Sequence, residues 1–240
     1  MMNQLLEIAV FNMVSAIAAA NAKADRLELC ENPFEGGTTP SYGFLKTVRE
    51  NIQIPVFPII RPRGGDFLYS DTEFQVMKKD ILLCKELGFE GVVFGLLQID
   101  GSIDLIRTSL LVSLAYPMEV TFHRAFDRAI HPFEALESII QTGANRILTS
   151  GQQPNAFDAK VFIKSLVAHA SDRIIIMPGS GVRSNNIKEL ATFTGVNELH
   201  SSARMMTPSR MDYHPTSMQE TIENCVVSTD EIHAMKKALS

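Results

Sequence analysis

The fold class is decided by one stretch of the chain, Pro58-Ile-Ile-Arg61-Pro-Arg63-Gly-Gly-Asp66. A run of apolar, largely β-branched residues ends abruptly in two arginines, two glycines and an acid. Such a run is typical of a buried strand, and α/β proteins place their binding sites at the carboxyl ends of parallel strands. We therefore predict a core strand that delivers Arg61 and Arg63 to a binding site.

The same pattern, a strand-like run that ends in polar residues, recurs along the chain. Short apolar runs alternate with segments of helical period, eight of each, which predicts parallel strands joined by helices. The predicted strands cover residues 5–11, 26–30, 56–61, 91–96, 119–123, 146–150, 173–178 and 198–202. The predicted helices cover residues 14–23, 42–50, 72–87, 104–115, 132–142, 157–170, 185–193 and 230–239.

Eight such units in 240 residues favour a single domain, residues 1–240, folded as a (β/α)8 barrel of the TIM type. The alternative is an open doubly wound sheet, but the first strand is not followed by the glycine-rich phosphate loop of a dinucleotide fold. One segment, residues 204–229, has no clear period and is predicted to be an irregular loop between the eighth strand and the last helix. Its methionines suggest a Cu(I)-collecting surface as the alternative.

Composition narrows the classes of partner. The net charge is -5 and the 22 basic residues form no run longer than two, which argues against nucleic acid as a partner. No apolar run approaches the roughly 18 residues that cross a bilayer, so no membrane partner is expected. Three cysteines fit a reducing compartment, and the start lacks the pattern of a signal peptide, so we expect a cytoplasmic protein. The sequence does not set the oligomeric state, and a homo-oligomer is one alternative.

Chemically active side chains occupy strand positions of matching parity. Because side chains alternate between the two faces of a strand, these groups are expected to converge in the upper barrel. The converging residues are Glu7, Glu28, Cys30, His123 and His200, with Met177 as a further neighbour.

Three kinds of chemistry compete for this cluster, beside a purely structural role. An acid–base site would draw on His123, Asp127, Glu7 and Glu28, because a histidine flanked by carboxylates titrates near neutral pH. A zinc or iron site would use two histidines and a carboxylate, whereas Cu(I) would prefer Cys30 with a histidine or methionine. The structural alternative is a set of buried charges that neutralise one another.

Anion-binding residues are predicted around the cluster. Arg61, Arg63 and Arg124 follow strands and would hold an anionic substrate. Loops seven and eight of such barrels often bind phosphate through backbone N–H groups. The candidates there are Gly179, Ser180, Gly181, Ser201 and Ser202, and the alternative for the glycines is a pair of tight turns.

Several motifs in order along the chain closely resemble the CutC copper homeostasis family. They are Leu6-Glu-Ile8, Ala24-Asp-Arg-Leu-Glu-Leu-Cys30, Glu35-Gly-Gly-Thr-Thr-Pro-Ser41, Ile60-Arg-Pro-Arg-Gly-Gly-Asp-Phe67, Thr121-Phe-His-Arg-Ala-Phe-Asp127, Leu148-Thr-Ser-Gly151 and His200-Ser-Ser-Ala203. The resemblance covers about residues 5 to 203. It implies a cytoplasmic TIM-type barrel that handles and binds copper.

This chain departs from the resemblance at Ala9, where many members of the family carry a cysteine beside Cys30. Two thiolates would form a simple Cu(I) site. Here copper would be bound by Cys30 with histidine, the candidates being His123 and His200, or with methionine, or it would be bound more weakly or not at all. Two functions are therefore expected to compete. One is copper binding or trafficking, and the other is an enzyme that acts on a phosphorylated or carboxylated metabolite at the barrel mouth.

Overall fold

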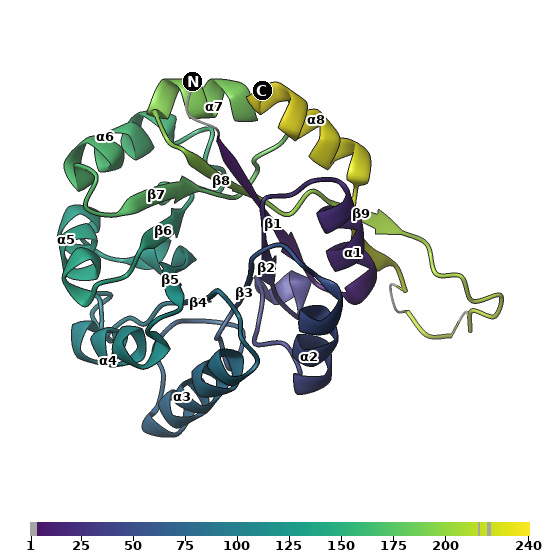
Figure 1. Ribbon diagram of the computed structural model, residues 1–240, viewed down its shortest axis with the longest axis horizontal. Coiled ribbons are helices and arrows are strands. Elements are labelled where there is room, and N and C mark those ends of the chain that lie inside the picture. Colours follow the sequence, from purple (N-terminus) through teal and green to yellow (C-terminus); the bar gives the residue numbers. More distant parts are fainter. Residues whose placement is uncertain (1–3, 216, 220–221) are drawn as a thin grey trace.

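A computed structural model describes residues 4–215, 217–219 and 222–240. Its strands run around a central axis with the helices outside them, which confirms the predicted (β/α)8 barrel (Figure 1). Two four-stranded parallel sheets, in the orders β3-β2-β1-β8 and β4-β5-β6-β7, make up the wall. A parallel bridge between Ile59, just after β3, and Val93 of β4 joins the two sheets.

The elements lie close to the predicted ranges. The barrel strands are β1 Leu5–Val10, β2 Arg26–Leu29, β3 Val56–Pro58, β4 Gly91–Phe94, β5 Glu119–Phe122, β6 Arg146–Thr149, β7 Ile175–Pro178 and β8 Glu198–Ser201. The helices are α1 Met13–Asn21, α2 Tyr42–Asn51, α3 Asp71–Glu86, α4 Leu105–Ala115, α5 Pro132–Thr142, α6 Lys160–Ala170, α7 Ile187–Thr194 and α8 Thr229–Leu239.

Helix boundaries follow local sequence signals. A capping box formed by Ser70 and Glu73 starts α3, Pro132 occupies the first turn of α5, and Gly143 ends α5 in the left-handed conformation. The exception is α6, which starts at Lys160 instead of residue 157. Ala159 at its N-cap has no side-chain oxygen, so the sequence carries no start signal there.

The barrel interior is partly aromatic and partly ionic. Phe57 of β3 lies between two guanidinium groups, 4.8 Å from Arg26 and 5.2 Å from Arg146. A Cβ atom at Gly91 would approach the Phe57 ring to 2.5 Å, so a glycine on β4 makes room for this ring. The lower barrel is thus filled by side chains, and the space for a ligand lies above it.

The prediction that residues 204–229 form an irregular loop is wrong at both ends. β9 (Arg204–Thr207) and β10 (Asn224–Val227) pair antiparallel and form an arm beside α1 (Figure 1). Each strand has only four residues, too few to show a two-residue period in the sequence. Residues 216, 220 and 221 lie outside the described part of the chain.

Across the residues that the structure describes, no helix is long and apolar enough to cross a membrane.

Candidate functional site

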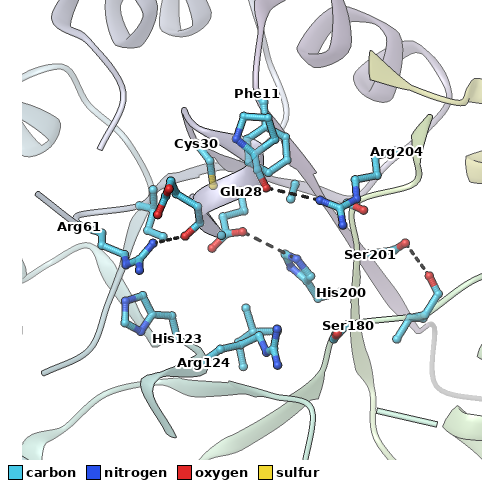
Figure 2. Close-up of a pocket in the computed structure, with 18 of the residues that line it drawn as sticks. Phe11, Glu28, Cys30, Arg61, His123, Arg124, Ser180, His200, Ser201 and Arg204 are labelled. Carbon is cyan, nitrogen blue, oxygen red and sulfur yellow. Dashed lines mark hydrogen bonds and ion pairs between the residues drawn. The ribbon is translucent and has the colours of Figure 1, made fainter. Parts of the chain in front are cut away.

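A pocket of about 480 Å³ opens at the carboxyl ends of the barrel strands. Residues at or beyond the ends of β1, β2, β5 and β8 line it, together with the loop that follows β7 (Figure 2). Ala9, Cys30, His123 and His200 are all among the lining residues. The structure therefore places the predicted strand-end chemistry around one cavity.

His200 lies between two buried carboxylates at the base of this pocket. Its Nδ1 is 2.8 Å from Glu7 Oε1, and its Nε2 is 3.7 Å from Glu28 Oε2. The register places Glu7 of β1 opposite His200 of β8 and opposite Arg26 of β2. Adjacent parallel strands thus build the cluster from residues that are far apart in the sequence.

The surroundings shift the pKa values of Glu7 and Glu28 in opposite directions. Burial alone would raise the pKa of Glu7, but the charge of Arg26 and the hydrogen bond from His200 lower it to about 2. Burial raises the pKa of Glu28, whose contact with His200 only partly offsets that effect. Burial alone would lower the pKa of His200, yet the hydrogen bond to Glu7 and the charges of Glu28 and Glu7 raise it above its usual value.

An ionic network continues below the cluster toward the opposite end of the barrel. Arg26 forms an ion pair with Glu7, and its Nη2 lies 2.6 Å from Glu198 Oε2. Arg146 Nε lies 3.0 Å from the same Glu198 oxygen, and its Nη2 lies 2.6 Å from Glu119. Arg26 Nη2 also contacts the sulfur of Met177 at 3.3 Å, so Met177 packs on the network below the pocket.

Cys30 presents a thiol to the pocket under conditions that disfavour the thiolate. Burial and the negative charge of Glu28 raise the pKa of Cys30 well above its usual value. Ala9 supplies no second sulfur ligand. The described residues contain no group of three or more His, Cys, Asp or Glu side chains placed to hold a metal ion. This donor set therefore fits a resident copper ion poorly.

His123 occupies a different wall from His200. Its ring packs against Phe67 with the centroids 4.9 Å apart, and its Nδ1 accepts a hydrogen bond from the Ala125 amide at 3.2 Å. Burial lowers the pKa of His123 to about 3, and the charge of Arg61 acts in the same direction. A Cβ atom at Gly95 would approach Nδ1 to 2.6 Å, so this glycine permits the position of the ring.

The two arginines of the opening stretch are placed differently. Arg61 lines the pocket, and its terminal nitrogens donate to the carbonyl oxygens of Glu35, Gly37 and Gly65 at 2.6 to 2.9 Å. Arg63 is not among the lining residues, and it pairs with Asp66 and Glu73.

Asp127 organises a neighbouring loop and does not line the pocket. Its carboxylate accepts hydrogen bonds from Thr149 Oγ1 at 2.5 Å and from the Ser150 amide at 2.9 Å. It also pairs with Arg124, which does line the pocket and which donates to Ser150 Oγ at 2.9 Å. Asp127 thus holds Arg124 at the mouth of the barrel.

The residues predicted to bind phosphate border the pocket, although the hydroxyl groups of two of them already have partners. Ser180 and Ser201 donate to the carbonyl oxygens of Pro154 and Val182, at 2.6 and 2.7 Å. Ser180 and Gly181 both have positive φ, and both line the pocket together with Ser202. Gly179 is not a lining residue, but a Cβ there would come within 3.2 Å of His200.

Sequence reasoning missed three arginines of the pocket wall, which are Arg128, Arg183 and Arg204. Arg128 and Arg204 are exposed and Arg183 is half-buried. None of them follows an apolar run directly in the way that Arg61 does. The one sequence signal that could have identified them is their position a few residues beyond a strand end, because such residues lie in the loops at the mouth of a barrel.

Fold and pocket define a (β/α)8-barrel protein with a pocket at the carboxyl ends of its strands. The model of the CutC family matches residues 4–205. The chain belongs to the CutC family.

Curated and solved relatives agree with this assignment. A CutC protein of Salmonella paratyphi A is 50% identical over 87% of this chain and 84% of its own length. The CutC protein of Salmonella typhi is also 50% identical, over 87% of this chain and 80% of its own. The crystal structure of CutC from Streptococcus agalactiae, named for copper homeostasis, has 33% identity and a TM-score of 0.79. That match covers 83% of this chain and 98% of the solved one.

Proposed function

We propose that this barrel is an enzyme that performs acid–base chemistry on a small anionic metabolite, one that carries a carboxylate or phosphate group. The observation that carries the proposal is a pocket with an acidic, histidine-containing floor and a wall of arginines. Five arginines line the cavity, against two acidic residues. The arginines are Arg61, Arg124, Arg128, Arg183 and Arg204, and the acids are Glu28 and Glu35.

The arginine wall supports an anionic ligand. Guanidinium groups bind carboxylates and phosphates with two parallel hydrogen bonds, and a cleft lined by charges of one sign concentrates the opposite ion. Arg183 and Arg204 stand beside the loop of positive-φ residues after β7, which is the region of such barrels that often binds phosphate. The ligand's charged group would lie there, and its reacting end would face the floor.

The floor supports proton transfer. The contact with Glu7 raises the pKa of His200, while Glu28 lies on the other side of the ring and also has a raised pKa. Neighbouring titratable groups with pKa values shifted in different ways are typical of general acid–base sites. In this proposal His200 donates a proton to the ligand, and Glu28 exchanges protons with the ligand.

A second candidate is the binding or trafficking of Cu(I) as a cargo, which the names of the relatives suggest. The observation that favours it is the Cys30 thiol at the pocket wall, within the same cavity as His123 and His200. A copper ion would have to displace the thiol proton against the effect of burial and Glu28. The three cysteines are free in the structure, which supports a cytoplasmic location for either function.

The enzyme proposal is tested by NMR in deuterated water with a panel of carboxylated and phosphorylated carbonyl compounds. We expect at least one compound to lose a C–H signal or to be converted in the presence of the protein. His200→Gln is expected to slow that change at least 100-fold, whereas His131→Gln, an exposed histidine outside the pocket, leaves it unchanged. Equal rates for His200→Gln and the native chain would contradict the proposal.

The copper candidate is tested on the same samples. Cu(I) affinity is measured anaerobically by competition with a chromogenic chelator, for the native chain and for Cys30→Ser. Because the donor set fits copper poorly, we expect weak binding that Cys30→Ser changes little. Tight one-to-one binding that is lost in Cys30→Ser would establish the copper function instead.

A further inference from the structure

Ion pairing separates the arginines of the pocket from those elsewhere in the chain. Outside the pocket, every arginine except Arg210 pairs with a carboxylate of the described residues. Of the five arginines that line the pocket, only Arg124 has such a partner, Asp127. The described part of the chain therefore leaves positive charge at the barrel mouth without a counter-ion, which favours an anionic ligand there.

Two of the unpaired arginines are in contact with each other. Arg183 follows β7 and is half-buried, whereas Arg204 begins β9 and is exposed. Arg183 Nη2 donates to the carbonyl oxygen of Arg204 at 3.1 Å, so its guanidinium lies against the backbone that carries the second arginine. Two neighbouring cations match a ligand group with two negative charges, such as a phosphate monoester, whereas a carboxylate carries only one.

The loop after β7 adds backbone N–H groups to the same cavity. The carbonyl oxygens of Ser180 and Gly181 accept hydrogen bonds from the Ala156 amide and from Asn186 Nδ2. The N–H groups of Ser180 and Gly181 donate to no atom of the residues that the structure describes. Ser180 is half-buried and Gly181 is exposed, and both line the pocket, so a ligand can reach this backbone. Backbone N–H groups left free in such a loop are typical of anion-binding sites.

Ser202, just after β8, contributes a further N–H group beside this loop. Ser202 is half-buried and lines the pocket, and its N–H has no acceptor in the described ranges of the chain. Ser201 Oγ donates to the Val182 carbonyl oxygen at 2.7 Å, which fixes the two loops to each other. Figure 2 shows Ser180, Ser201 and Arg204 along the same side of the pocket. The arginines and the N–H groups thus border one part of one cavity.

This part of the pocket adjoins His200. Ser202 follows His200 by two residues, and an extended chain rises about 3.3 Å per residue, so their Cα atoms lie roughly 7 Å apart. A Cβ atom at Gly179 would approach His200 Cδ2 to 3.1 Å, so the loop after β7 begins against this ring. A ligand that contacts both the loop and His200 needs only a few atoms between its two ends.

We propose that Arg183, Arg204 and the N–H groups of Gly181 and Ser202 bind the dianionic phosphate of a short phosphate monoester. This inference rests on the proposed function and narrows its substrate class from small anions to phosphate esters. The two arginines balance the two charges of the phosphate, and the N–H groups bind its remaining oxygens. The reacting end of the ester, a few atoms away, then faces His200.

The first test compares methyl phosphate, dimethyl phosphate and acetate as probes of the native protein. Saturation-transfer NMR at pH 7.5 follows the methyl protons that all three compounds carry. Methyl phosphate has close to two negative charges at this pH, whereas the other two compounds have one. We expect methyl phosphate to bind at least 10-fold more tightly than either monoanion. Equal affinity for the three compounds, or a preference for acetate, overturns the inference.

Substitutions of the arginines locate the site. We expect Arg183→Gln and Arg204→Gln each to weaken the binding of methyl phosphate at least 10-fold. Arg183→Lys keeps the charge and loses the planar fork, so it should stay within about 5-fold of the native chain. Arg173→Gln, at a surface arginine outside the pocket, should bind as the native chain does. Unchanged binding in both glutamine variants of the pocket overturns the inference.

The backbone contacts are tested by the amide signals of the 15N-labelled protein. We expect the amide protons of Gly181 and Ser202 to move downfield on saturation with methyl phosphate, because hydrogen bonds to a charged acceptor are short and strong. Gly195, which ends α7 and does not line the pocket, is the control. Binding of methyl phosphate that leaves the Gly181 and Ser202 signals in place overturns the inference.

The results separate this inference from the proposal beneath it. If methyl phosphate and acetate bind equally well and both lose affinity in Arg183→Gln, the phosphate site fails while the anion-binding pocket remains. If none of the three probes binds the native chain, both the phosphate site and the proposed function fail.

Discussion

At the scale of single residues, the state of His200 depends on a carboxylate from the next strand. Glu7 is fully buried and accepts the His200 Nδ1–H at 2.8 Å, while Arg26 holds its other oxygen. The pKa of His200 is therefore raised in a place where burial alone would lower it. A histidine with a raised pKa at the floor of an arginine-lined pocket is the chemical core of the proposed function.

Glu7→Gln should lower the pKa of His200. The substitution keeps the shape of the side chain but removes a negative charge and a charge-assisted hydrogen bond, so the protonated ring loses its main stabilising contact. NMR titration of the His200 ring measures the effect. Glu35→Gln, in the loop after β2, is the control and should leave this pKa close to that of the native chain. A His200 pKa that is unchanged by Glu7→Gln would contradict the account.

Arg26→Leu should destabilise the protein by about 3–5 kcal/mol, because it leaves Glu7 and Glu198 buried without their shared cation. Urea unfolding at pH 7 measures the loss. Arg173 forms a pair with Glu137 at the surface, where solvent screens the charges, so Arg173→Leu should cost much less stability. Equal losses for the two variants would show that the buried network contributes no more than a surface pair.

The sequence predicted the carboxylate–histidine cluster at the base of the pocket better than the contacts of the arginines around it. Strand parity was enough to bring Glu7, Glu28 and His200 together, because the two-residue alternation of a strand is readable without a structure. The partners of Arg61 could not be predicted, since its guanidinium binds backbone carbonyls of two loops. Loop conformation carries no comparable periodic signal.

At the scale of elements, one glycine on a strand and one on a helix differ in the space that an added methyl group would find. Gly91→Ala on β4 places a methyl group 2.5 Å from the Phe57 ring, whereas Gly43→Ala on α2 meets nothing within 4 Å. We expect Gly91→Ala to destabilise the fold by about 1–3 kcal/mol through overpacking. Gly43→Ala should stabilise it by up to about 1 kcal/mol through helix propensity. Chemical denaturation of both variants measures the difference, and the same sign for both would contradict the packing described here.

All eight barrel strands and all eight helices are predictable from the sequence, because each has an apolar period and most have a cap. The arm formed by β9 and β10 is not, since among the described residues its two short strands pair only with each other, across 17 to 23 residues of sequence. Met205, Met206, Met211 and Met218 are exposed on the arm and the segment between its strands. The copper-collecting alternative for these methionines stays a prediction.

At the scale of the whole molecule, buried titrating groups predict a loss of stability in acid. The pKa of His123 is lowered from 6.5 to about 3, so the unfolded chain binds more protons in that range and stability falls as the pH drops. The pKa of Glu7 is lowered from 4.5 to about 2, so its contribution is lost below pH 4.5. His200 acts in the opposite sense, because its raised pKa adds stability below about pH 6.5 that is lost as the pH rises.

Urea unfolding of the native chain and His123→Phe, measured from pH 7 to pH 4, tests this balance. Removing the group with the lowered pKa should flatten the decline between pH 6.5 and 4.5, while the decline below pH 4.5, to which Glu7 contributes, remains. Parallel curves for the two proteins over the whole range would rule out His123 as a source of acid sensitivity.

Anion binding at the barrel mouth is tested directly by a calorimetric titration of the native protein with 2-phosphoglycolate, which carries both a phosphate and a carboxylate. We expect saturable one-to-one binding that weakens at least 10-fold in Arg183→Gln or Arg204→Gln. Arg173→Gln, a surface arginine outside the pocket, should bind as the native chain does. No saturable binding, or equal affinity in all these variants, would contradict a barrel mouth built for small anions.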